Sequence, residues 1–142
     1  MASRDITCHQ LVLEDHPLGL APTQDSPLTC LSCYTRLEEE SSVECECGFR
    51  MCLSPECRQD ETHKPEHDLF VRAGVRSQGR ADYPLVMPIR LLTLLEGAGL
   101  ETRDRLGRLM DHREDRRRPG GEWVQADRAV IQPILRLSQD QH

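Results

Sequence analysis

The sequence predicts a small zinc-stabilised finger with little regular structure, followed by an α-helical region. Six cysteines and two histidines lie between Cys30 and His67, which predicts a metal-binding segment. Beyond residue 83, apolar residues recur at the three-to-four spacing of amphipathic helices. Only 37% of the 142 residues are hydrophobic and 4% are aromatic, so a single large core is not expected.

The cysteines and histidines follow one another as C-x2-C, C-x-C, C-x4-C and H-x3-H. Zinc binds thiolate and imidazole in tetrahedral sites, and a short spacer lets two neighbouring residues reach one ion. The segment therefore has enough ligands for two zinc ions and leaves neither ion the open position that catalysis needs. The predicted ligand pairs are Cys30 with Cys33, Cys45 with Cys47, Cys52 with Cys57, and His63 with His67.

Two local signals place ligands within this segment. Ser54 and Pro55 are typical of a helix start, with the serine as N-cap and the proline in the first turn. Cys57 would then lie near a helix N-terminus, which lowers the pKa of a thiol. Gly48 permits a tight turn directly after Cys47.

Metal is expected to be a condition of folding for the finger. The finger has few apolar side chains. The entropic free-energy cost of ordering its backbone exceeds the free energy that burial of these side chains contributes. Each structural zinc brings an apparent ~10–16 kcal/mol to small finger domains. A chelator should therefore unfold the segment cooperatively.

Charge and composition limit the partners and the location. The net charge of −6 argues against strong binding to nucleic acid. No stretch approaches a membrane span and no signal peptide is visible, so we expect no membrane partner and an intracellular protein, nuclear and/or cytoplasmic. In a reducing compartment, clustered cysteines are metal ligands before they are disulfides. Cys8 lies alone and is expected to be a partly buried free thiol, and the histidines outside the cluster stay unassigned.

Four regions emerge along the chain. Prolines and turn residues make the first one extended, and a polar, glycine-containing stretch separates the cysteine region from the helices. The predicted regions are the leader 1–29, the zinc finger 30–67, the connector 68–82 and the helical region 83–142.

The helical region predicts three helices. The first ends before Gly97 and has Pro88 in its first turn; the second spans about 101–117, and the third about 123–138, kinked or shortened by Pro133. The predicted inward faces are Leu85, Ile89 and Leu92 with Leu91 or Leu95, then Leu106, Leu109 and Met110, then Val130, Ile131, Ile134 and Leu135.

Several short segments of the sequence resemble a known family. CLSCYTRL, CECGFRMCLSPEC and HKPEH resemble the MYND zinc finger of arthropod-type SET-and-MYND (Smyd-like) proteins. HPLGLAP resembles the end of a SET N-terminal segment, and YPLVMPIRLLTLLE with LMDHREDRR resembles the helical insert that follows the finger.

The resemblance implies two interleaved zinc sites. One ion would be held by Cys30, Cys33, Cys52 and Cys57, and the other by Cys45, Cys47, His63 and His67. The chain departs from the family pattern because the last ligand is a histidine, and because Glu44 takes the place of the cysteine expected by C-x2-C. Either Cys45 or Glu44 could therefore complete the second site.

The resemblance also implies a function. MYND fingers dock short proline-containing peptides, so the first hypothesis is a protein-interaction module with protein partners. The alternative is a fragment or inactive relative of a SET-domain protein-lysine methyltransferase involved in transcriptional or chromatin regulation. The sequence contains no asparagine for the cofactor motif, and its only tyrosines, Tyr34 and Tyr83, are not placed for catalysis. We therefore expect no methyl transfer, no catalytic residues and no binding of S-adenosylmethionine. A RING ubiquitin ligase fits less well, because both histidines come last.

Overall fold

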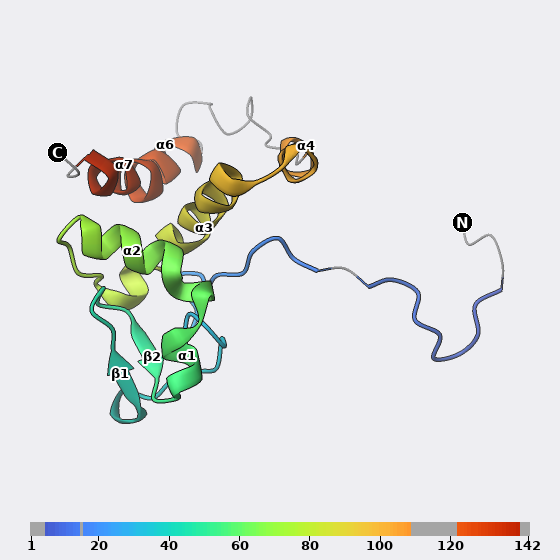
Figure 1. Cartoon of the computed structure of the whole chain (residues 1–142), viewed down its shortest axis with the longest axis horizontal. Helices are drawn as coiled ribbons and strands as arrows, with labels where there is room; N and C mark the ends of the chain where they lie inside the picture. Colours follow the sequence, from blue (N-terminus) through green and yellow to red (C-terminus); the bar gives the residue numbers. More distant parts are fainter. Residues whose placement is uncertain (1–4, 15, 109–121, 140–142) are drawn as a thin grey trace.

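A computed structural model of the chain describes residues 5–14, 16–108 and 122–139. The described residues of the leader run as an extended segment away from the rest of the molecule before they join the cysteine region (Figure 1). Among the described residues, the leader makes one β-type pairing, an isolated antiparallel bridge between Thr29 and Arg36. Cys8 is exposed rather than partly buried, because the early part of the leader does not pack on the body.

The cysteine region contains a small antiparallel hairpin and short helical segments. Strand β1 (Ser42–Glu44) follows the 3₁₀ turn η1 (Glu39–Ser41) and pairs with β2 (Arg50–Cys52), with Val43 opposite Met51. Helix α1 (Pro55–Gln59) and the 3₁₀ turn η2 (Glu61–His63) lead into α2 (Lys64–Arg72). Little regular structure was predicted here, and the two strands are only three residues long.

Helix α2 continues past the residue at which the finger was expected to end. Phe70, which lies in the predicted connector, is a buried residue of α2. A turn η3 (Gly79–Asp82) then leads into α3 (Tyr83–Gly97).

The helices after residue 83 confirm the predicted helical character of that region. In α3, Pro84 occupies the first turn and Pro88 lies in the interior, so the position predicted for Pro88 was wrong. The helix starts earlier because Pro84 has a fixed φ suited to a first turn, where its missing N–H has no partner to lose. Leu92, predicted to face inward, is half exposed, while Val86 is buried.

Helix α4 (Leu100–Gly107) matches the first half of the second predicted helix. Its continuation, with Leu109 and Met110, lies outside the described residues.

The third predicted helix is a run of three segments that ends at the last described residues. Helix α6 (Glu122–Ala126) passes into a π-helical turn (Asp127–Ile131) and then α7 (Gln132–Gln139). The π turn directly precedes Pro133, which cannot donate a backbone hydrogen bond. Because a π turn holds an extra residue, it rotates the face that follows. Ile134 and Leu137 are buried, whereas Leu135, predicted to face inward, is exposed.

One hydrophobic core joins the cysteine region to the helices. Cys47, Phe49 and Phe70 contribute to it from the cysteine region. Helix α7 packs over α2 and α3 and closes it (Figure 1). Its other buried members are Leu31, Tyr83, Leu85, Val86, Ile89, Ile134 and Leu137. Among the residues that the structure describes, every helix is too short or too polar to traverse a lipid bilayer.

Candidate metal centres

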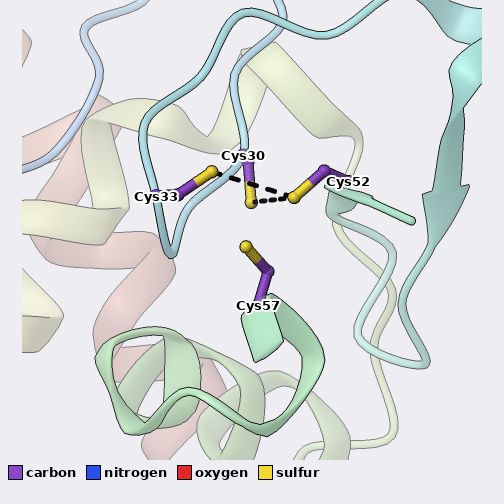
Figure 2. A group of neighbouring side chains, drawn as sticks. All are labelled: Cys30, Cys33, Cys52 and Cys57. Carbon is purple, nitrogen blue, oxygen red and sulfur yellow. Dashed lines mark hydrogen bonds between the residues drawn. The ribbon is translucent and has the colours of Figure 1, made fainter. Parts of the chain in front are cut away.

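Four cysteines converge from three separate segments. Cys30 and Cys33 lie on a loop, Cys52 ends β2, and Cys57 lies in α1, with all four sulfurs pointing toward one centre (Figure 2). Their Sγ atoms lie within 4.8 Å of one another. The Cys33 and Cys52 sulfurs are 3.8 Å apart, and those of Cys52 and Cys30 are 3.6 Å apart. Sulfurs at ~2.3 Å from a tetrahedral zinc would be about 3.8 Å apart, so the spacing fits an ion at the centre.

The loop that carries the first two cysteines is closed by backbone hydrogen bonds. The N–H of Cys30 donates to Thr35 O at 3.0 Å, and the N–H of Tyr34 donates to Cys30 O at 2.9 Å. Tyr34 has a φ of 61°, in the left-handed region that a non-glycine residue rarely adopts. Ser32 Oγ donates to Cys57 O at 2.8 Å, which fixes this loop to α1.

The local start of α1 differs in part from the prediction. Pro55 occupies the first turn as expected, but the Ser54 side chain makes no capping hydrogen bond within the described part of the chain. The pKa of the Cys57 thiol is raised rather than lowered, first by its hydrogen bond with Cys52 and then by burial. A helix of five residues is too short to outweigh neighbouring thiols.

Hydrogen bonding lowers the pKa of Cys33, the exposed cysteine of the group. Thr35 hydrogen bonds lower the pKa of Cys33 to about 6, below the ordinary value of a thiol. A thiolate is the form that binds metal. The lowered pKa therefore favours the metal-binding form of Cys33.

Cys45, Cys47 and His63 form the second group, and their ligand atoms also lie within 4.8 Å of one another. Cys47 Sγ is 3.3 Å from His63 Nε2, and both residues are buried, with exposed fractions of 0% and 4%. Burial raises the pKa of the Cys47 thiol to about 12. A metal ion would have to displace a tightly held proton from this sulfur.

Gly48 makes the turn between Cys47 and β2 possible. Its φ of 93° is unfavourable for residues with a Cβ, as the sequence predicted for a tight turn here. A Cβ at this position would lie 2.6 Å from both the N and the O of Ser77. The Ser77 N–H donates to Cys47 O at 2.7 Å, so the close approach secures the cysteine.

Two further predicted ligands lie outside the second group. The His67 ring centroid is 5.8 Å from that of His63, and His67 Nδ1 is 3.2 Å from Asp68 Oδ1. His67 as fourth ligand therefore stays a prediction. The Glu44 carboxylate accepts a hydrogen bond from Arg76, whereas Cys45 belongs to the group. The structure thus favours Cys45 over Glu44.

A buried ion pair that sequence reasoning missed supports the second group. Glu66 Oε1 is 2.9 Å from His63 Nδ1, and the same carboxylate is paired with Arg90 of α3. Glu66 could have been found as the acidic residue three positions after His63, on the same helical side. Arg90 has no such signal, because only the tertiary fold brings α3 to this point.

The donor sets fit zinc. All seven cysteines of the chain are free thiols. A set of four thiolates is typical of a structural zinc site, and two thiolates with an imidazole supply three of the four ligands that such a site needs. In the second set, hydrogen bonding between His63 Nδ1 and Glu66 would leave Nε2 for the metal.

Of the remaining histidines, His9 and His16 lie in the leader, while His112 and His142 lie outside the described residues. The leader histidines belong to neither ligand group.

No family model, curated protein or solved structure matches this chain. The likeness to MYND and Smyd-like proteins therefore rests on the short sequence segments and the order of the ligands alone.

Proposed function

We propose that this chain is a zinc-binding protein-interaction module that docks short proline-containing peptides of partner proteins. The observation that carries the zinc-binding part is the convergence of Cys30, Cys33, Cys52 and Cys57 within 4.8 Å. A complete set of four thiolates leaves no coordination position for a substrate, which supports a structural role for that ion.

A cavity beside the second ligand group supports docking. It has a volume of about 460 Å³ and lies between the β1–β2 hairpin and the segment from α1 to α2. This volume falls within the ~300–1,000 Å³ typical of small-ligand sites, and so suits a few peptide residues. Val43 gives it apolar contact area, and Met51, Cys45, His63 and His67 also line it. Binding at this cavity would depend on metal because predicted metal ligands form part of its wall.

The chemistry of the partner follows from the cavity and from the resemblance. The resemblance to MYND fingers supports a proline-containing segment, which is extended before it binds and so loses little entropy. The acidic residues Glu44, Glu46, Asp60 and Glu61 line the cavity, against the basic residues Arg58 and Lys64. We therefore propose a peptide that also carries a lysine or arginine.

The test is fluorescence anisotropy with labelled peptides and the zinc-loaded full chain. Peptides combine proline or alanine with lysine or glutamate at neighbouring positions. We expect the proline and lysine series to bind, and we expect EDTA to abolish binding.

Val43→Arg should reduce the affinity at least tenfold, because it places a charge inside the cavity. Leu92→Arg, on the exposed side of α3, is the matched control and should leave the affinity unchanged. Equal binding by the proline and alanine series, or binding that survives Val43→Arg, would reject docking at this cavity.

A further inference from the structure

A buried ion pair lies between the two groups of metal ligands. Glu66 is 0% exposed and Arg90 is 8% exposed. Burying a charged pair has an effective desolvation penalty of several kcal/mol per ion, which only good geometry and further hydrogen bonds offset. This pair therefore requires a well-satisfied environment.

Arg90 has that environment, because each of its five N–H donors has an acceptor. Nε donates to Glu66 Oε2 at 3.0 Å, and Nη2 donates to Glu66 Oε1 and to Leu31 O, the latter at 2.9 Å. Nη1 donates to Leu20 O at 2.7 Å and to the Tyr34 hydroxyl. Although burial opposes its charge, hydrogen bonding to Glu66 raises the pKa of Arg90. A lysine, with three donors at one nitrogen, could not replace this set.

One side of the guanidinium reaches the second ligand group through the carboxylate. Glu66 Oε1 is 2.9 Å from His63 Nδ1, and His63 Nε2 faces Cys47 Sγ at 3.3 Å. A carboxylate on one ring nitrogen fixes the tautomer and the ring orientation, so that the other nitrogen presents its lone pair to a metal. Glu66 is thus placed to orient His63.

The two Nη groups of the guanidinium also reach residues beside the first ligand group. Leu31, whose carbonyl oxygen accepts from Arg90, directly follows Cys30, and Tyr34 directly follows Cys33. The Tyr34 hydroxyl also donates to Leu20 O at 2.8 Å, and its ring lies 5.8 Å from the Arg90 guanidinium carbon. A single side chain of α3 therefore contacts the supports of both metal sites.

We infer that Arg90 and Glu66 are positioning residues that link the two metal sites, so that filling one site raises the affinity of the other. An ion at the four cysteines orders Leu31 and Tyr34, which supply acceptors to Arg90. Arg90 then holds Glu66, and Glu66 holds His63 in its metal-binding orientation. The effect is reciprocal by linkage, and typical factors are about 5–150-fold. This inference rests on the two metal sites of the proposed function.

The experiment is a cobalt(II) titration of the full metal-free chain, with zinc competition against a chromophoric chelator. Thiolate-to-cobalt charge-transfer bands and d–d bands distinguish a four-sulfur site from a site with sulfur and nitrogen. For the wild type we expect both sets of bands to grow together. For Glu66→Gln and Arg90→Lys we expect separate steps, with the affinity of the site containing His63 reduced about 10–100-fold.

Matched controls separate this effect from a general loss of charge. Asp104→Asn removes an exposed carboxylate paired with Arg108, and Arg72→Lys changes an exposed arginine of α2. Both should titrate like the wild type. Tyr34→Phe removes one acceptor of Arg90 and keeps both charges. It gives a milder decoupling that can be measured even if the two charge variants do not fold.

Each outcome decides one question. Separate, independent filling in the wild type, or joint filling in Glu66→Gln, Arg90→Lys and Tyr34→Phe, overturns the link between the sites while zinc binding stands. A wild-type chain that takes up neither metal overturns the proposed function itself.

Discussion

The two groups of metal ligands differ in how the rest of the chain supports them. The four-cysteine group takes its ligands from the loop around Cys30 and Cys33, from β2 and from α1, and α3 is tied to that loop by hydrogen bonds of Tyr83 and Arg90. The group of Cys45, Cys47 and His63 lies against the main core, to which Cys47 itself belongs. The comparison teaches that both groups depend on the tertiary fold: the first is tied to α3 by hydrogen bonds, and the second is built into the core.

Zinc removal should have the largest effect and should show whether the two regions depend on each other. Each site is expected to bring an apparent ~10–16 kcal/mol, which matches or exceeds the ~5–15 kcal/mol stability of a typical domain. Because Cys47 lies in the core shared with α3 and α7, we expect EDTA to unfold the cysteine region and the helices in one transition. Far-UV circular dichroism with native mass spectrometry measures both events. A spectrum that EDTA leaves unchanged would count against metal-dependent folding.

Gly48→Ala should weaken the second group selectively. The substitution places a Cβ at a φ of 93° and 2.6 Å from the Ser77 backbone, on the residue after Cys47. Left-handed strain costs of order 1–3 kcal/mol, and the clash adds to it. Urea denaturation of the zinc-loaded protein measures the loss, and cobalt spectra identify the affected site.

Gly74→Ala is the control for this change. Gly74 also has a positive φ, of 65°, but a Cβ there meets nothing within 4 Å. The Gly74→Ala variant should lose only the stability that corresponds to backbone strain. Equal losses for the two variants would mean that the contact with Ser77 contributes nothing.

Tyr83→Phe should affect the first group by a smaller amount. The Tyr83 hydroxyl accepts from Thr29 N at 3.0 Å and donates to Thr29 O at 3.2 Å, one residue before Cys30. Its removal leaves a buried N–H unpaired, which costs ~1–3 kcal/mol, while the ring still stacks on Phe49.

Urea denaturation at saturating zinc measures the Tyr83→Phe loss. Ser138→Ala, which deletes a hydroxyl that donates to Ile134 within α7, is the comparison variant and should cost less. If Tyr83→Phe were as stable as the wild type, α3 would not support the loop of Cys30.

The sequence could predict the parts of the site that depend on local chemistry. Short spacers identified the cysteine pairs, and Gly48 marked a turn whose φ is indeed positive. The helices after residue 83 followed from apolar spacing. Pattern alone left the crossing of the pairs open, because their grouping depends on how the hairpin and α1 fold over the loop.

The remaining features depend on long-range packing. Arg90 looked like any arginine on a helix, and only its approach to Leu20, Leu31 and Glu66 gives it a role. The inward face of the last helix was wrong at Leu135 because a π turn before Pro133 shifts the register. Such a turn cannot be read from a regular helical period.

Glu44→Gln should have the smallest effect, and it tests which residue completes the second group. Glu44 is half exposed and paired with Arg76, and an exposed pair contributes ~0–1 kcal/mol. We expect a nearly unchanged stability and unchanged cobalt bands, because Cys45 supplies the sulfur. Cys45→Ser is the matched variant and should weaken the thiolate-to-cobalt band of the second site. A band that depends on Glu44 and survives Cys45→Ser would instead make the carboxylate the ligand, and would move the second site toward the surface.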